Sequence, residues 1–193
     1  MRNSKEGAAQ SRERILAAAA RMFRADGIEA VSVGDVMTKA GMTHGGFYKH
    51  FASKEALVAE ACSFAMKESG ARLRAAAEGA KKGEELKAIV DAYVTERHCD
   101  NPASGCALAA LGGELGRTNS AAREALAEGR TAFVSLVARH WNGPDARTNA
   151  SALVSALVGA IVNARIAGDD SGKVLRAARR ASHRRIDEAK RAH

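Results

Sequence analysis

The chain has 193 residues, 46% of them hydrophobic, and a formal net charge of +8 at neutral pH. That length fits one domain or two small ones with a buried core, and the charge suits a polyanionic partner, either nucleic acid or an anionic membrane surface. Two prolines and 4% aromatic residues favour an all-helical protein, and no strand pattern occurs along the chain.

The N-terminus and the cysteines favour a cytoplasmic protein. The first six residues are polar and charged with no apolar run after them, so a secretory signal is not expected. The longest apolar tract, residues 150–162, is interrupted by two serines and is shorter than the ~18–20 residues of a membrane span. Cys62, Cys99 and Cys106 form no disulfide framework, which suits a reducing compartment.

The first predicted helix follows a polar terminus. Residues 1–9 carry scattered charge and are expected to lack regular structure. From Ser11 onward, apolar residues recur at helical spacing up to Gly27, which is a natural helix end. A helix over residues 11–27 is therefore expected.

Two short helices about a glycine turn are predicted next. Ser32 followed by Asp35 is a capping-box pattern that begins the first of them. Gly41 supplies the left-handed conformation of a tight turn, and Thr43 is placed to cap the second. Two such helices make a helix-turn-helix, whose second helix enters the DNA major groove.

The second of these helices, residues 43–51, resembles a known recognition helix. Phe47 and Phe51 stand four residues apart and share an inward face, so we read them as core. Phe-Tyr-Lys-His-Phe-Ala-Ser-Lys-Glu-Ala-Leu, residues 47–57, resembles the N-terminal DNA-binding domain of the TetR/AcrR transcriptional regulators. The likeness covers roughly residues 10–60.

The resemblance implies a helix-turn-helix DNA-binding domain in residues 1–52 and a helical effector-binding and dimerisation domain in residues 53–193. It carries onto DNA-facing positions the residues Thr43, His44, Gly45, Tyr48, His50 and Lys54. Ser32 and Lys49 are further candidate DNA contacts. Gly46 departs from the larger side chains often found at its position, which leaves a base contact there in doubt.

Beyond residue 52 the apolar spacing predicts further helices and turns. Ser53 and Ser120 are placed to cap two of the helices. We expect helices over residues 53–79, 84–97, 106–115, 120–141, 149–167 and 171–192, with a loop over residues 98–105. Within the segment 106–115, Gly112 and Gly113 are expected to break the helix.

The last two predicted helices have contrasting surfaces. Residues 149–167 are apolar nearly all round, which requires cover on several sides. The resemblance implies a homodimer through the last two helices, and the alternative is a core helix within a monomer. Residues 171–192 are rich in arginine, which indicates either a solvated face or a second nucleic-acid contact.

Candidates for an effector site come from the resemblance and from one cysteine. The resemblance implies a pocket among the middle helices, with the candidate liners Phe64, Tyr93, Leu111, Phe133 and Trp141, each of which is alternatively core. Cys106 stands at a predicted helix N-terminus, where amide dipoles favour a thiolate. Residues 105–115 also resemble the Gly-Cys-Leu segment of a TetR subgroup that includes electrophile- and oxidant-responsive repressors. The alternative for Cys106 is a small buried hydrophobe.

The function expected from the sequence is that of a regulator. No phosphate-binding glycine loop, nucleophile elbow or standard zinc spacing occurs, so we expect no enzyme, no metal and no cofactor. We expect a dimeric repressor that binds an inverted-repeat operator in double-stranded DNA. An unknown small molecule, or modification of Cys106, would release it. The rivals are an architectural nucleic-acid binder without sequence choice and an enzyme without a recognisable motif.

Overall fold

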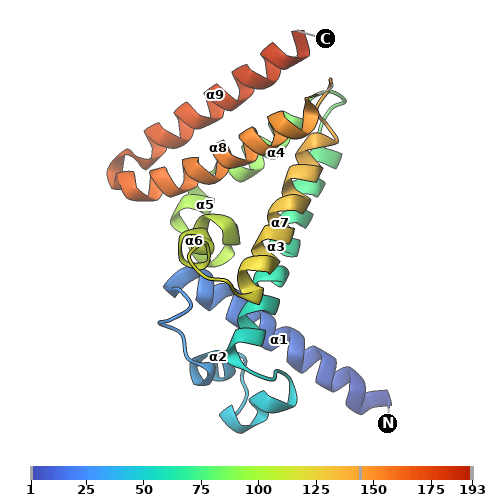
Figure 1. Ribbon diagram of the computed structural model, residues 1–193, viewed down its shortest axis with the longest axis vertical. Coiled ribbons are helices and arrows are strands. Elements are labelled where there is room, and N and C mark those ends of the chain that lie inside the picture. The colour runs from blue at the N-terminus through green and yellow to red at the C-terminus, as the bar shows by residue number, and fades with distance from the viewer. Residues whose placement is uncertain (1, 144, 192–193) are drawn as a thin grey trace. The chain divides into compact units, whose positions relative to one another are not determined.

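The computed structural model describes residues 2–143 and 145–191, with helices and turns but no strand among them (Figure 1). The predicted all-helical class is confirmed. In chain order the helices, with 3-10 helices labelled η, are α1 (Arg2–Asp26), α2 (Val33–Lys39), η1 (His44–Lys49), α3 (Lys54–Glu78), α4 (Glu85–Tyr93), α5 (Glu96–Asp100), η2 (Pro102–Ser104), α6 (Ala107–Leu115), α7 (Ala121–Ala138), α8 (Ala146–Ala167), η3 (Gly168–Asp170) and α9 (Ser171–Arg191).

The contacts of the chain fall into two compact units. The first contains the residues up to Lys67 together with Pro102–Ala127, and the second contains Glu68–Asn101 together with the residues from Glu128 onward. The helices α3 and α7 each continue from one unit into the other. Segments that are far apart in the sequence therefore share a unit.

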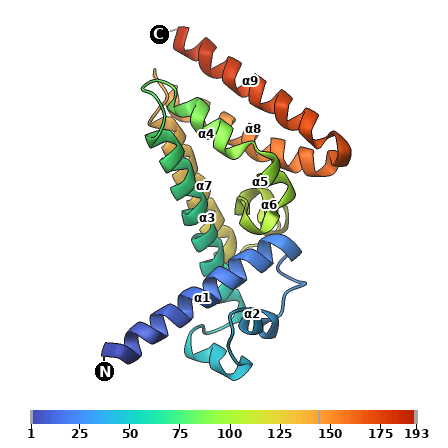
Figure 2. The same cartoon turned by 180° about the vertical axis from the view of Figure 1, so that it is seen from behind.

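The first unit is built around α1. This helix packs against α2, η2 and α6 (Figure 2). Its apolar face buries Ile15 and Phe23 completely, and Val36 and Met37 of α2 are equally buried. Burial of apolar surface contributes about 25 cal/mol of stabilising free energy per Å². Because helices as short as α2 and η1 are not stable in isolation, this shared core is what stabilises them.

The second unit places α8 beside α9, with α4 and α5 against them (Figures 1 and 2). The buried face of α8 consists of Leu153, Leu157 and Ile161, each at most 1% exposed. Its other face leaves Val162 and Ile166 exposed at 38% and 79%. This outer face of α8 therefore has no cover within the described residues of the single chain.

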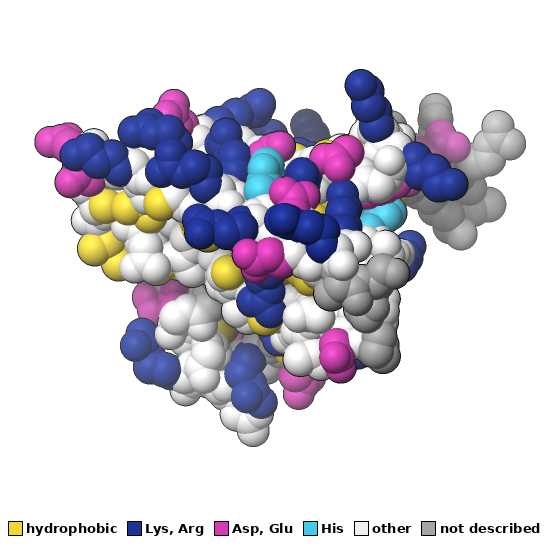
Figure 3. Space-filling model, turned by 90° about the horizontal axis from the view of Figure 1, so that it is seen from above, with side chains coloured by type: hydrophobic (Ala, Val, Ile, Leu, Met, Phe, Trp, Pro, Cys, Tyr) yellow, Lys and Arg dark blue, Asp and Glu magenta, His cyan; other side chains and the backbone are white. Residues whose placement is uncertain are grey.

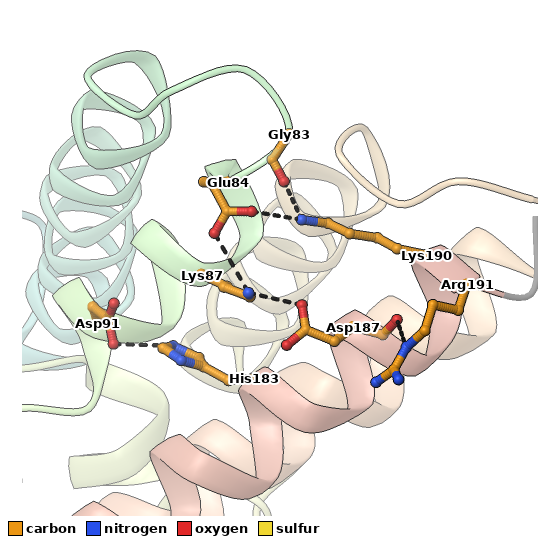
Figure 4. Close-up of polar contacts among 8 residues, drawn as sticks. All are labelled: Gly83, Glu84, Lys87, Asp91, His183, Asp187, Lys190 and Arg191. Carbon is orange, nitrogen blue, oxygen red and sulfur yellow. Dashed lines mark hydrogen bonds and ion pairs between the residues drawn. The ribbon is translucent and has the colours of Figure 1, made fainter.

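Ion pairs join α4 to α9 (Figure 4). The ammonium nitrogen of Lys87 lies 2.7 Å from a carboxylate oxygen of Asp187 and 3.5 Å from one of Glu84. Lys190 in turn lies 2.9 Å from Glu84 and donates to the carbonyl oxygen of Gly83. Hydrogen bonds from the two lysines hold the pKa of Glu84 and that of Asp187 below their usual values. The pKa of Lys87 is raised by its hydrogen bond with Asp187.

Two boundaries in the first half of the chain differ from the sequence expectation. The helix α1 begins at Arg2 and not near Ser11, because the residues before Ser11 include no proline and several good helix formers. The predicted helix over residues 84–97 is interrupted after Tyr93. Val94 leaves the helical conformation, and Thr95 begins α5 by accepting the amide hydrogen of His98 at 3.1 Å. The expected loop thus contains part of α5 and all of η2.

Further boundaries differ in the second half. Gly112 and Gly113 do not break α6, because helical glycines cost only about 1 kcal/mol each relative to alanine. The helix α7 ends at Ala138, and α8 already begins at Ala146. The last helix begins at Ser171 as expected, whereas its expected end at residue 192 lies outside the described residues.

One stretch within Ala146–Arg191 is long and apolar enough, by length and composition alone, to cross a membrane, in a search limited to the described residues. The core helix of a soluble protein satisfies the same criteria. Of the apolar 18-residue window in this stretch, 39% is buried inside the structure.

Candidate nucleic-acid interface

The predicted capping box of α2 is confirmed in both directions. The hydroxyl oxygen of Ser32 accepts the amide hydrogen of Asp35 at 3.1 Å, and the Asp35 carboxylate accepts the amide hydrogen of Ser32 at 3.0 Å. The same carboxylate accepts the Ser32 hydroxyl at 2.5 Å. These bonds, the hydroxyl first, hold the pKa of Asp35 below its usual value. The hydroxyl hydrogen of Ser32 is therefore engaged within the protein.

The turn after α2 is the predicted glycine turn. Gly41 has a φ of +71°, in the left-handed region that a residue with a Cβ rarely adopts. The amide of Met42 donates to the carbonyl of Met37 at 2.9 Å, which closes the end of α2. This geometry directs the chain from α2 into η1.

The predicted recognition helix is a 3-10 helix and not an α-helix. Thr43 begins η1 through its extended backbone, but its side chain makes no capping hydrogen bond, so the expected side-chain cap is wrong. Two successive glycines, Gly45 and Gly46, lower the helix propensity here by about 1 kcal/mol each. A short 3-10 segment is the result.

Aromatic packing fixes which side chains of η1 face outward. Phe47 and Phe51 are at most 3% exposed, with ring centroids 5.8 Å apart, which confirms both as core. Tyr48 packs edge-on against Phe47 yet remains 74% exposed. Its phenol is available to a partner.

The other predicted DNA contacts surround Tyr48 in sequence. Exposed positions are Ser32, Thr43, His44, Gly45 and Lys49, and half-buried positions are His50 and Lys54. The His44 ring lies 3.5 Å from the point where a Cβ on Gly34 would stand, so the start of η1 is next to the start of α2. The surface thus combines a phenol, imidazoles, ammonium groups and a hydroxyl, which are the donors that contact phosphates and base edges.

The start of α3 adds a further donor group. The Ser53 hydroxyl accepts the amide hydrogen of Ala56 at 3.2 Å, which confirms the predicted cap. Lys54 is the first residue of α3, so its ammonium lies beside the partial positive charge of the helix N-terminus. A phosphate oxygen is the natural ligand of such a pair.

Arg12 holds the interface together, and sequence reasoning missed it. Its guanidinium is 2.5 Å and 2.7 Å from the two carboxylate oxygens of Glu60 and stacks 4.6 Å from the centroid of the Phe51 ring. The bond joins α1 to α3 across the helix-turn-helix. An arginine and a glutamate 48 residues apart carry no pairing signal in one sequence.

Arg24 was also missed, and it is 4% exposed. Its guanidinium donates at 2.8 Å to the carbonyl of Ala20 and at 2.8 Å to that of Gly105. It therefore ties α1 to the residue that precedes Cys106. Nearby, burial raises the pKa of the Cys62 thiol to about 11, which keeps that group protonated.

The structure divides the effector candidates between the two units. Tyr93 and Phe133 come together in the second unit, where their rings stack 5.4 Å apart and both are buried. Cys106, which begins α6, and Leu111 are buried in the first unit at 2% exposure each. The half-buried Phe64 belongs to the first unit, and Trp141 lines a cavity in the second. Within the residues described, no cluster of His, Cys, Asp or Glu could hold a metal ion.

A helical unit that exposes a capped helix-turn-helix with cationic and aromatic side chains defines a DNA-binding protein of the helix-turn-helix class. Residues 15–61 match the family described as bacterial regulatory proteins, tetR family. This match identifies the helix-turn-helix segment of the chain as similar to the DNA-binding part of the tetR-family regulators.

Curated relatives match a short part of the chain. The HTH-type transcriptional regulator AcrR of Shigella flexneri is 37% identical over 59 residues, which are 31% of this chain and 27% of that protein. The uncharacterized HTH-type regulator YdgC of Bacillus subtilis (strain 168) is 45% identical over 51 residues, 26% of each chain. The chain thus spans less than a third of the length of these curated relatives.

Solved structures match nearly the whole chain. A TetR transcriptional regulator from Chloroflexus aurantiacus J-10-FL is 25% identical with a TM-score of 0.80, covering 97% of both chains. The reduced form of E. coli NemR is 19% identical with a TM-score of 0.77, covering 89% of this chain and 94% of that one. The latter likeness concerns the fold alone.

Proposed function

We propose that this protein is a sequence-specific transcriptional regulator, most simply a repressor that binds an inverted-repeat operator as a dimer. The observation that carries the proposal is the exposed phenol of Tyr48, whose ring packs edge-on against the buried ring of Phe47. A large side chain held 74% exposed on a rigid aromatic base is preorganised for a base edge or a phosphate. The match of residues 15–61 to the tetR family supports the same role.

Each candidate contact has a proposed task. Lys54 and Thr43 bind phosphate oxygens, since both stand at helix starts. His44 and Tyr48 reach base edges, and Gly45, which has open space around it, allows the backbone to approach the duplex. Ser32 contacts phosphate only if its hydroxyl leaves Asp35, so its contribution is expected to be the smallest.

We propose α8 and α9 as the dimer interface. The outer face of α8 presents small or apolar side chains at helical spacing, namely Ala152, Ala156, Gly159, Val162 and Ile166. Such a face lets a second helix approach closely and buries Val162 and Ile166. In this proposal residues 1–52 bind DNA and residues 53–193 serve dimerisation and effector binding, in the cytoplasm.

The experiment for the proposed function is binding to the DNA just upstream of the protein's own coding region, against shuffled DNA of equal length. We expect preference for the native segment and a loss of roughly tenfold or more in Tyr48→Ala, because a base contact is worth about 1–3 kcal/mol. Lys81→Ala, an exposed position outside the helix-turn-helix, is the control. Equal binding of wild type and Tyr48→Ala to the native segment would contradict the proposal.

Release through Cys106 is a second part of the proposal. Cys106 begins α6 directly after Gly105, whose carbonyl accepts the buried Arg24 of α1. An adduct on the sulfur, which is 2% exposed, would displace that turn and its bond to α1. We expect an electrophile to weaken operator binding in wild type and to leave Cys106→Ser unaffected. Release that persists in Cys106→Ser would exclude the mechanism.

One observation favours the architectural alternative. On α9 the exposed Arg176, Arg180 and Arg184 are spaced four residues apart, and none has a carboxylate partner within the described residues. Lys and Arg gather on the face seen in Figure 3. If these cations bind DNA without sequence choice, native and shuffled DNA will bind with equal affinity. A plot of log K against the logarithm of the salt concentration will then have a negative slope of about 0.9 for each phosphate contact. The matched regulators, which are not enzymes, give no support to the enzyme alternative.

A further inference from the structure

The second unit contains a cavity that the helix-turn-helix does not use. Its volume is about 280 Å³, near the lower end of the roughly 300–1,000 Å³ of small-molecule sites. The cavity is lined by three segments, namely the start of α4, the end of α7 with the following turn, and the end of α9. The lining residues are Lys82, Gly83, Glu85, Leu86, Arg139, His140, Trp141, Asn142, Ile186, Ala189 and Lys190. Gly83 and Lys190 mark its position in Figure 4.

The floor of the cavity is apolar. Trp141, Leu86 and Ile186 contribute to it and are exposed at 6%, 5% and 1%. Because neighbouring side chains pack these groups on their other sides, their orientation is fixed. An apolar body of a few carbon atoms would find a preformed surface there.

The rim of the cavity carries an excess of positive charge. Lys82 and Arg139 are exposed, and neither has a carboxylate partner within residues 2–143 and 145–191. Lys190 is already bound to Glu84 and to the Gly83 carbonyl, and Glu85 supplies the one carboxylate in the lining. Two cations therefore remain available to an anion over an apolar floor.

We propose that this cavity binds small organic carboxylates, with the apolar body against Trp141 and the carboxylate between Arg139 and Lys82. A guanidinium binds a carboxylate through two parallel hydrogen bonds, and the lysine adds a point charge. That the bound carboxylate acts as the effector rests on the proposed function, since occupancy must then lower the affinity for the operator.

The test uses the tryptophan of the cavity, which is the single tryptophan of the chain. Phenylacetate, titrated into the full-length protein at constant ionic strength, should change the Trp141 fluorescence saturably below about 10 mM, a range set by weak single-site affinities. Phenylacetamide, its neutral analogue of the same shape, should bind about tenfold more weakly or not at all, because it cannot accept charge-assisted bonds.

Substitutions assign the response to the rim. Arg139→Gln and Lys82→Gln should each weaken phenylacetate binding about fivefold to tenfold. Arg147→Gln removes the same charge from an exposed residue of α8 outside the lining and should bind as wild type does. Trp141→Phe should abolish the fluorescence signal, while calorimetry still detects phenylacetate, which separates loss of the reporter from loss of the site.

Several results would overturn the proposal. They are the absence of a saturable response to phenylacetate, equal affinity for phenylacetamide, and unchanged affinity in Arg139→Gln. The effector role is tested separately with the DNA upstream of the coding region. If that DNA is preferred over shuffled DNA but phenylacetate does not weaken its binding, the effector role is excluded. If no DNA preference exists, the regulator proposal fails, whereas carboxylate binding is still decided by fluorescence.

Discussion

At the residue scale, the local chemistry of the helix-turn-helix follows closely from the sequence. The pair Ser32 and Asp35 forms the expected reciprocal cap, and Gly41 adopts the expected left-handed conformation. These features depend on residues three or four positions apart, so a single sequence contains all the information they need. Arg12 and Arg24 could not be predicted in the same way, because their partners Glu60 and Gly105 are distant in the chain.

A substitution in the cap measures its contribution. Ser32→Ala removes the acceptor for the Asp35 amide and the hydroxyl bond to its carboxylate, so we expect a loss of about 1 kcal/mol in the free energy of unfolding. Urea denaturation is the measurement. Ser32→Thr keeps a hydroxyl and should lose clearly less. Equal stability of the alanine variant and wild type would mean that the capping box contributes nothing to the fold.

At the scale of the element, existence was easier to predict than boundaries. The apolar spacing predicted the long helices, but it continued through Tyr93 and Val94 and concealed the start of α5 at Thr95. A capping threonine was the available signal, and it was outweighed by the periodicity. Gly45 and Gly46 lower the helix propensity of η1, but that local signal does not by itself specify a 3-10 conformation.

The pairing of α4 with α9 should depend on pH. Because the pKa of Asp187 is lowered in the folded state, its contribution to stability is present above its usual value of about 4 and is lost as the pH falls through the lowered value. The raised pKa of Lys87 acts in the opposite sense, and its contribution is lost only as the pH rises through that value.

Melting temperatures measured between about pH 6 and pH 3 test this dependence. We expect Asp187→Asn to melt at a lower temperature than wild type at pH 6. The difference should shrink towards pH 3 and in high salt, since the side chains of Lys87 and Asp187 are partly exposed to solvent. Asp169→Asn, an exposed change in η3, is the control. A difference that is the same at both pH values would rule out the ion pair as its cause.

At the scale of the whole molecule, the dimer can be tested at one glycine. A Cβ on Gly159 would meet no atom within 4 Å, so an arginine there faces open space in the single chain. We expect Gly159→Arg to be monomeric by analytical ultracentrifugation yet folded, because arginine favours the helix by up to about 1 kcal/mol over glycine. Gly113→Arg in α6, where the surroundings are equally open, should remain dimeric. A dimeric Gly159→Arg would exclude the proposed interface.

The architecture of the first unit was beyond sequence reasoning. The division by role at residues 52 and 53 stays a prediction, and the contacts add that the N-terminal residues up to Lys67 share a compact unit with Pro102–Ala127. Arg24 belongs to this grouping, since a buried guanidinium requires the Gly105 carbonyl. Contacts over such a separation depend on the complete fold, which local patterns do not encode.

The bond from Arg24 to Gly105 has a consequence for modular recombination. A modular view treats the DNA-binding domain and the effector-binding domain of a regulator as exchangeable parts. A chimera that joined residues 1–52 to a foreign sensor would keep the bond from Arg24 to the Ala20 carbonyl but lose the bond to the Gly105 carbonyl. To fold, the foreign partner must supply an equivalent turn, or Arg24 must become apolar. The helix-turn-helix of this protein should therefore be transferred together with Pro102–Ala127, which belongs to the same compact unit.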